Sequence, residues 1–504
     1  ADVELATRFG KADMKEQIGQ IRQSYRELRA NVEAGKNADG SMPKKPFTDI
    51  EKAKLLRRLV NAEKNDIRDI EAMRDMVRGT YLARDNSTNF ARAARVAGTI
   101  NYLRTMGGVT ISSLADVARH VMVHGLTNVM RDGLVPLITN LKGFKMSVDE
   151  AKIAGAVTER LLNTRMATWS DIIDPYSVSS PFERFMENAA NGFSRLNGLV
   201  YWNDFQKSFA SVITQNRVLR DAGDYGRLDK RERAYLAFLG IDQSMAERIA
   251  RQFDEYGTVE PGNIRVANSD DWDDTIARQT YRAAINKDVD SIIVSKGVGD
   301  IPLFMNTPTG KLIGQFKSFA LASHQRVLMR GLQERPTGFI AGTMMAAATG
   351  MLIYYLKSVE SNRMEDLSDN PGRWIAEGLD RSGIFSIAFE VNNTVEKAFG
   401  LGAYGALMKA FPNASQEGAA SRYAMRSTAA ALTGPTGDLI DTAIRAGQAI
   451  KKQTLGDADG DPAKWTQGDI NSIRRLVPGA TLPGIRSLVE YLGMPAVEQQ
   501  LGVY

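Results

Sequence analysis

Residues 181–212, which read PFERFMENAANGFSRLNGLVYWNDFQKSFASV, carry the clearest folding signal in the chain. Apolar side chains recur there at three- and four-residue steps, which places them on one face of an α-helix. Ser180 and Glu183, with Pro181 at the first helical position, form a candidate capping box. The pattern predicts one long buried helix over residues 180–221. Its apolar face comprises Phe182, Phe185, Ala189, Phe193, Leu196, Val200, Phe205, Phe209 and Val212.

Helical patterns of the same kind dominate the rest of the chain. Residues 229–239 end at Gly240, which suits a left-handed helix stop, and the next helical pattern runs to Gly257, so a helical hairpin is expected here. Period-two alternation is nearly absent, and the best strand candidate, residues 292–294, is too short to build a sheet. We therefore predict an all-α fold, an elongated multi-helix assembly with long helices and a Gly-rich apolar helical segment. Further candidate capping boxes pair Ser147 with Glu150 and Ser244 with Glu247.

Breaks rich in Gly, Pro and Asp divide the chain into four predicted regions. These are a charged N-terminal helical region (1–135), a helical bundle that contains the long helix 180–221 (136–258), a basic helix followed by an apolar membrane-candidate helix (259–366), and a Gly-rich C-terminal helical region (367–504). The first region suits a solvated bundle or an assembly arm.

The bulk composition excludes several classes of protein. Of the 504 residues, 43% are hydrophobic and 24% charged, which is enough apolar material for several cores and unlike a disordered chain. The absence of Cys rules out disulfides and thiolate metal sites, and three His leave little room for histidine chemistry. A net charge of +5 over this length does not by itself indicate a nucleic-acid-binding protein.

The motifs that resemble catalytic or metal sites are incomplete. His120 and His124 lie at i and i+4 without the Glu of a zinc-hydrolase helix, so a partly buried or surface pair is the favoured interpretation. Residues 400–405 spell GxGxxG without a preceding strand, and residues 457–461 begin like a calcium loop that lacks the turn Gly and the closing Glu. We expect no catalytic residue, no metal and no cofactor, and hence a protein that is structural and not an enzyme.

Residues 336–356, PTGFIAGTMMAAATGMLIYYL, contain no charged side chain. In a helix, about 21 residues reach roughly 30 Å, the thickness of the hydrocarbon core of a bilayer. Thr, Gly and Ala make the segment only marginally hydrophobic, so a membrane span and a buried helix in a soluble bundle both remain open. Small residues at every fourth position form a smooth face on which another helix can lie close, at Gly338, Gly342, Ala346 and Gly350. The candidates for membrane insertion are Phe339, Ile340, Met344, Met345, Met351, Leu352 and Ile353.

A basic helix is predicted just before the apolar segment. Thr307 and Pro308 can open it, and its cations lie away from its apolar face. Lys311, Lys317 and Arg330 are therefore candidates for contacts with phosphate or lipid head groups. A core-packing helix with a solvated charged face is the alternative.

Four short sequence words in the C-terminal part carry a family resemblance. They are Gln315, Phe316, Lys317, Ser318 and Phe319 with Arg326 and Leu328; then Asp380, Arg381, Ser382 and Gly383; then Gly434, Pro435, Thr436 and Gly437; then Leu482, Pro483 and Gly484. In this order, around a Gly-rich apolar helix, they resemble the C-terminal region of the large internal virion proteins of short-tailed bacteriophages, also called DNA ejection proteins. The resemblance covers about residues 300–495.

The resemblance implies a helical homo-oligomer that is packed inside the capsid with other internal virion proteins above the portal. On infection such proteins leave the virion and form a conduit through the host cell envelope, in contact with membrane lipid and, in passing and without sequence specificity, with phage DNA. Some family members carry a lytic transglycosylase domain, and this chain shows no match to it. The alternative interpretation is a soluble helical scaffold or accessory segment of a large phage polyprotein that does not enter a membrane.

Overall fold

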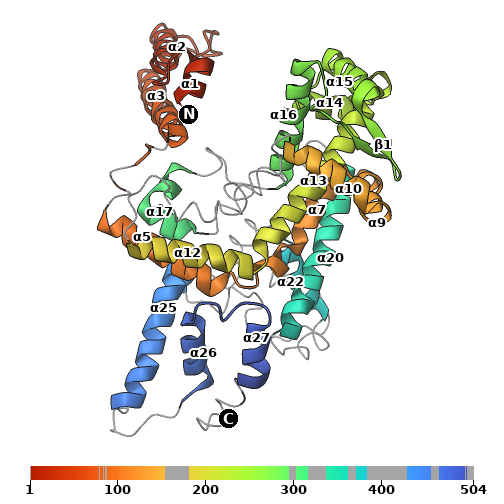
Figure 1. The fold of residues 1–504 in the computed structure, drawn as a ribbon. Helices are drawn as coiled ribbons and strands as arrows, with labels where there is room; N and C mark the ends of the chain where they lie inside the picture. Colours follow the sequence, from red (N-terminus) through yellow and green to blue (C-terminus); the bar gives the residue numbers. More distant parts are fainter. Residues whose placement is uncertain are drawn as a thin grey trace. The chain divides into compact units, whose positions relative to one another are not determined.

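The computed structural model describes residues 2–78, 80–82, 85, 88–153, 181–293, 302–315, 336–360, 371–382, 428–455, 465–493 and 495. Among these residues 79% are helical and 2% lie in strands, which confirms the predicted all-α fold (Figure 1). The chain divides into two compact units, one formed mainly by Ala1–Ala91 and the other by most of the chain after it. The boundary between them lies inside the predicted N-terminal region 1–135.

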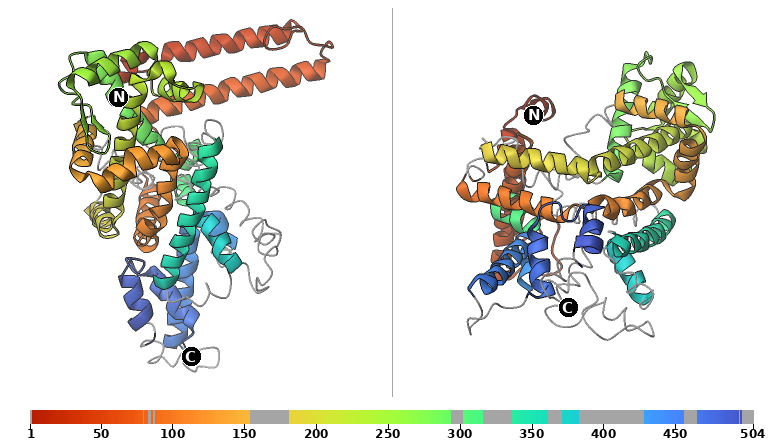
Figure 2. Two further views of the ribbon diagram at one scale, coloured as in Figure 1. Left: turned by 90° about the vertical axis from the view of Figure 1, so that its right-hand side faces the viewer. Right: turned by 60° about the horizontal axis from the view of Figure 1, so that its bottom comes forward.

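The first unit is built on a helical hairpin of α2 (Lys15–Glu33) and α3 (Asp49–Arg78), with α1 (Asp2–Phe9) beside it (Figure 2). Thr48 and Glu51 start α3 with a reciprocal capping box, because the Glu51 carboxylate accepts from the Thr48 backbone N–H at 2.9 Å and the Thr48 hydroxyl accepts from the Glu51 N–H at 3.3 Å. Polar pairs cross the seam between the two helices. They are Tyr25 with Asp66, Arg29 with Glu63, and Lys52 with the carbonyl of Glu33.

The structure of the second unit corrects the prediction of one long buried helix over 180–221, because the helix is broken and Phe182, Phe185 and Leu196 of its predicted buried face are exposed. The structure has two helices, α12 (Pro181–Leu196) and α13 (Leu199–Gly223). Gly198 adopts a left-handed conformation with φ of 77°, and the Asn197 side chain accepts from the Leu199 N–H at 3.0 Å, so the chain stops and restarts there. The apolar repeat continues across this break, which is why the sequence pattern did not show it.

Two predicted capping boxes are also wrong. Ser147 and Glu150 lie buried inside α10 (Leu141–Ile153), where Glu150 accepts from the backbone N–H of Ser269 at 2.9 Å. The cap of α15 (Gln243–Tyr256) is Asp242, two residues before Ser244, and its carboxylate accepts from the Met245 N–H.

The second unit also contains elements before α12 and after α13. Those before α12 are α5 (Asn89–Thr105), α6 (Val109–Ser112), η1 (Ser113–Asp116), α7 (Val117–His124), α8 (Leu126–Val129), η2 (Met130–Leu134) and α9 (Val135–Thr139). Those after α13 are η3 (Tyr225–Arg227), α14 (Lys230–Phe238), β1 (Thr258–Glu260), β2 (Ile264–Val266) and α16 (Thr275–Ile292). Of the elements after α16, η4 (Leu303–Asn306) and the first residue of α17 (Pro308–Gly314) belong to the first unit. The later elements of the second unit are the rest of α17, α20 (Pro336–Glu360), α22 (Pro371–Arg381), α25 (Thr428–Leu455), α26 (Gln467–Leu476), α27 (Ile485–Leu488) and η6 (Val489–Gly493).

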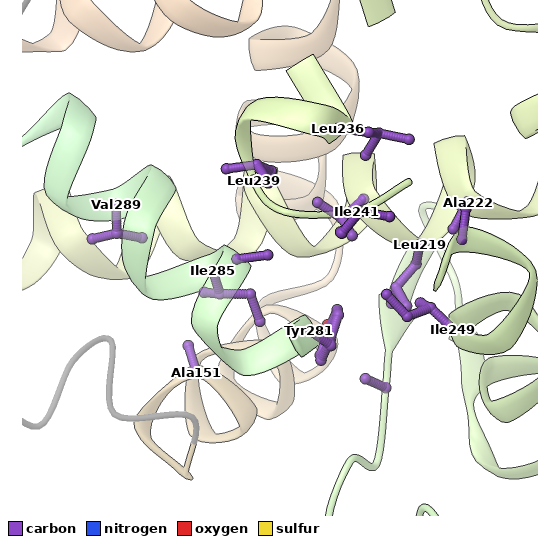
Figure 3. Packing of buried hydrophobic residues seen from close by; sticks show 14 of the residues in the cluster. Ala151, Leu219, Ala222, Leu236, Leu239, Ile241, Ile249, Tyr281, Ile285 and Val289 are labelled. Atoms are coloured by element: carbon purple, nitrogen blue, oxygen red, sulfur yellow. The ribbon is translucent and has the colours of Figure 1, made fainter. Parts of the chain in front are cut away.

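The largest core forms where α14, α15 and α16 pack around the C-terminal half of α13. Leu219 of α13, Ile249 of α15 and Ile285 of α16 meet in it, as Figure 3 shows. The two helices expected within residues 229–257 are present, and Gly240 between them has a φ of 88°. After α15, β1 and β2 form a two-stranded antiparallel hairpin, with Val259 opposite Arg265. Three-residue strands are too short to give a period-two signal, and residue 292, in the best strand candidate, ends α16 instead.

The middle of α13 is buried on every side although much of it is polar. Each of these polar side chains therefore needs a partner from a neighbouring element. Asn216 donates to the carbonyl of Asp132 at 3.0 Å and accepts from the backbone N–H of Arg265 at 2.6 Å. Gln215 donates to the carbonyl of Ser147 at 2.8 Å. Through such bonds α13 fixes η2, β2 and α10 around itself.

Replacing Asn216 with Ala leaves the carbonyl of Asp132 and the N–H of Arg265 without their side-chain partner. Because each unpaired buried group costs about 1–3 kcal/mol, we expect the free energy of unfolding to fall by about 2–4 kcal/mol. Urea denaturation of the full chain measures it. Asn188→Ala, at an exposed position of α12, is the matched control and should change stability by less than about 0.5 kcal/mol. Equal effects of the two substitutions would contradict the bridging role of Asn216.

Candidate functional site

The apolar segment forms the greater part of α20. Within the described residues, Phe339–Glu360 is the one helical stretch long and apolar enough to cross a membrane, with a mean hydropathy of 1.5 over its most apolar window. Length and composition alone qualify it, and a third of that window is buried within the chain itself. The core helix of a soluble protein can meet the same criterion, so the surroundings of α20 decide what it can do.

The small-residue face of α20 packs against two helices of its own chain, α7 and α22. A Cβ atom added to Gly342 would overlap Met122 of α7, and one added to Gly350 would overlap the backbone carbonyl of Gly378 in α22. Ala346, between these two glycines, is completely buried. Only glycine allows two helix backbones to approach this closely. Small residues at four-residue spacing on α20 therefore determine where α7 and α22 cross it. The contacts of Gly338 lie outside the described residues.

The opposite face of α20 is an exposed apolar stripe. Ile340 is 60% exposed, Met344 70% and Leu352 48%, and Tyr355 and Val359 extend the row towards the C-terminal end. These positions share one side of a helix, since they follow each other at multiples of three and four residues. The other insertion candidates lie towards the protein: Phe339 and Ile353 are buried, and Met345 and Met351 are half-buried. A contiguous apolar row of this kind is typical of a surface that contacts lipid or another protein.

Polar contacts that hold α20 to other described elements all lie in its last ten residues. The indole N–H of Trp374 donates to the carbonyl of Met351 at 2.9 Å, and the Tyr491 hydroxyl donates to the carbonyl of Val359 at 2.8 Å. Lys357 contacts the hydroxyl of Ser112. The guanidinium of Arg381 lies 4.4 Å from the centre of the Tyr354 ring, a cation–π contact. In the described part of the chain, the earlier turns of α20 are held by packing.

Residues of three of the four family-like words meet at α5. The Gln315 side chain donates to the carbonyl of Gly98 at 2.8 Å and accepts from Asn101 at 3.1 Å. The Asn101 amide also lies 3.3 Å from the Thr436 hydroxyl. Leu482 is buried with Tyr102 of the same helix. Segments that are far apart in sequence thus pack on one helix, and these residues hold the segments to it.

The fourth word lies at the end of α22. Arg381 pairs with Glu377 one turn earlier, and the Ser382 hydroxyl donates to the carbonyl of Leu379 at 2.6 Å. Asp380 is in the same helix, and its side chain lies outside the described residues. Lys311 is half-buried on α17. Phe316, Lys317, Ser318, Phe319, Arg326, Arg330 and Gly383 also lie outside the described residues.

His120 and His124 are both completely buried, which corrects the expectation of a partly buried or surface pair. His120 Nε2 lies 2.5 Å from the Gln206 side-chain oxygen, and burial lowers the pKa of His120 to about 4. His124 Nδ1 lies 3.1 Å from Arg217 Nη1. Since a guanidinium only donates, Nδ1 accepts and the proton of neutral His124 resides on Nε2, which faces Asp288 at 3.5 Å.

The cluster around Asp288 contains residue types that are found in catalytic sites, but it is closed to solvent. Its carboxylate accepts from the Thr214 hydroxyl at 2.8 Å and from the Tyr235 hydroxyl at 2.7 Å. Asp288 and His124 have no exposed surface, so a substrate cannot reach them in this state. The cluster joins α7, α13, α14 and α16. Sequence analysis missed it because its members are up to about 160 residues apart and match no local motif.

Comparison of the chain with protein-family models, with curated proteins and with solved structures finds no match. The described residues contain no group of three or more His, Asp and Glu side chains placed to hold a metal ion. The candidate site is therefore α20, with one face on α7 and α22 and the other exposed.

The buried His120 makes stability depend on pH. The pKa of His120 in the folded chain, about 4, lies below the usual 6.5. The stability that depends on a neutral His120 is therefore fully present above pH 6.5 and is lost as the pH falls towards 4. The unfolded chain takes up this proton first, so the free energy of unfolding falls by about 1.4 kcal/mol per pH unit across that window. Urea denaturation of the wild type and of His120→Asn between these pH values measures how much of the pH dependence of stability comes from His120. If both proteins lose stability with the same slope, His120 is not the group responsible.

Gly350 tests the close crossing of α20 and α22. Gly350→Ala places a methyl group against a backbone carbonyl that cannot rotate away, so we expect a loss of about 1–3 kcal/mol in the free energy of unfolding. Gly447→Ala in α25 is the matched control, because nothing lies within 4 Å of the added Cβ. Alanine is the better helix former, so this control should gain about 0.5–1 kcal/mol. A gain at both positions would show that the crossing is looser than described.

Proposed function

We propose that this chain is a structural protein of a phage particle that enters a lipid bilayer through α20 and helps to form a conduit through the host cell envelope for genome delivery. The observation that carries the proposal is the two-sided character of α20. One face is smooth enough for helix pairing, and the other presents Ile340, Met344 and Leu352 to solvent. Both are the properties required of a helix that leaves a protein surface for lipid.

Entry into a bilayer exchanges one set of helix contacts for another. Among the described residues, no side-chain hydrogen bond joins the early turns of α20 to α7. These turns can therefore separate from α7 without breaking one. In lipid, Gly342 and Ala346 would again be free for close packing, while Gly350 stays against α22, to which the last turns of α20 are tied. A second copy of α20 offers the same small residues, so homo-oligomerisation follows naturally from insertion. The polar contacts at the C-terminal end would keep α20 tethered to its own chain.

The family resemblance supplies the biological setting of this proposal. It implies a location inside the capsid with other internal virion proteins and the portal, and then in the host envelope after ejection. Host membrane lipid is the partner of α20, and phage DNA passes through the assembly. The conservative alternative is a soluble helical scaffold of a phage polyprotein. The burial of Ala346 and Ile353 against the same chain favours this alternative, so the test must separate the two.

The test is a charge placed on the exposed stripe. Met344→Arg leaves the soluble fold intact because residue 344 is 70% exposed. A charge near the middle of a span costs about 2.5–3.5 kcal/mol on insertion scales, so flotation with liposomes and dye release should fall about tenfold or more. Met42→Arg, at a residue that is 79% exposed in the other unit, makes the same chemical change and should leave both signals unchanged. Equal flotation of wild type and Met344→Arg would favour the soluble scaffold.

A further inference from the structure

The outer face of α3 carries a line of five polar side chains, four of which are basic. Lys54, Arg57, Asn61, Lys64 and Arg68 follow each other at alternating steps of three and four residues, and all are exposed. That spacing keeps them on one side of the helix. The line is about 21 Å long, at about 1.5 Å per residue. We call these five residues the basic stripe.

The fold separates the charges of this helix. Glu63 pairs with Arg29, and Asp66 accepts from the Tyr25 hydroxyl at 2.6 Å, so both carboxylates turn towards α2. Glu51 is used in the capping box with Thr48. The hairpin thus takes up these acidic side chains and leaves the cations on the outside. Counting charged residues along the sequence does not show this separation, because α3 as a whole contains acidic and basic residues in similar numbers.

The cations of the stripe are also available for a partner. Among the described residues, Lys54, Arg57 and Lys64 make no ion pair, and neither does Arg58 beside them; Arg68 pairs with the exposed Asp69. Residues 52–62 contain no acidic side chain. At about 1.5 Å per residue, Arg57 lies about 4.5 Å beyond Lys54 along the helix axis, and Lys64 lies about 10.5 Å beyond Arg57. Unpaired cations along a rigid helix create a positive potential that a polyanion would neutralise.

We propose that the basic stripe binds the phosphodiester backbone of nucleic acid without sequence specificity. Its length matches about six phosphates of one DNA strand, which follow each other at about 3.4 Å along the helix axis. An anionic membrane is the less suitable partner, since a membrane-surface helix sets aromatic or leucine side chains beside its cations. The large apolar side chains at or beside the stripe are Ile50 and Val60, and α3 contains no aromatic residue. This inference assigns residues to the DNA contact in the proposed function, and it does not depend on α20.

The experiment measures binding of the full chain to a mixed-sequence duplex of about 30 base pairs between about 50 and 200 mM salt, by fluorescence anisotropy. The test variant combines Lys54→Gln, Arg57→Gln and Lys64→Gln. The control variant combines Lys142→Gln, Lys145→Gln and Lys230→Gln, three exposed cations of the other unit, and so has the same net charge. All six positions are exposed, and circular dichroism checks that both variants keep their helices.

We expect the test variant to bind at least about tenfold more weakly than wild type at low salt, with a log–log salt slope that is shallower by about two to three units, because each lost phosphate contact removes about 0.9. The control should stay within about twofold of wild type. Equal losses in both variants would mean that only net charge matters and would overturn the assignment. The same two variants are also compared with wild type on anionic vesicles, where any binding through α20 is common to all three proteins. If the test variant loses more binding to vesicles than to the duplex, the choice of partner is overturned. Since liposome flotation through α20 is measured separately, either proposal can fail alone.

Discussion

The second unit depends on the need to satisfy the polar side chains in the buried middle of α13. Residues of α13 that would be solvated on an ordinary helix are instead bonded to its neighbours, so η2, β2, α10 and α16 are held at fixed positions around it. Leaving any of these groups unpaired is expensive, because water cannot replace the lost partner. This gives a specific, rigid body. On its other side that body presents α7, the surface on which α20 lies.

The attachment of α20 is of the opposite kind. Close glycine contacts give it shape complementarity, while the hydrogen bonds and ion pairs that tie it to other described elements are confined to its last turns. Packing contacts between apolar surfaces are non-directional, and lipid can replace them with little loss. A helix held in this way can exchange partners, whereas α13 cannot. The contrast between the two helices is the physical basis for assigning stability to one and function to the other.

Sequence periodicity predicted the all-α fold, because three- and four-residue steps are a local property. It also predicted that Gly342 and Gly350 share a smooth face, while the helices that lie on that face, α7 and α22, depend on long-range packing. The same limit explains the errors. Ser147 and Glu150 match a capping box locally, yet their partners are Gln215 and Ser269, far along the chain. The burial of His120 and His124 likewise follows from residues that no motif connects to them.

We propose that the exposed stripe of α20 moves from water into the hydrocarbon of a bilayer. The chain has no cysteine, so Met344→Cys gives a single site for an environment-sensitive fluorophore, and Met42→Cys gives the matched reference. With vesicles that carry quenchers at known depths in their acyl chains, we predict a blue shift and deep quenching of the probe at residue 344, and an unchanged, water-like spectrum at residue 42. If the probe at residue 344 stays as water-exposed as the one at residue 42, α20 remains on its own protein and does not enter the bilayer.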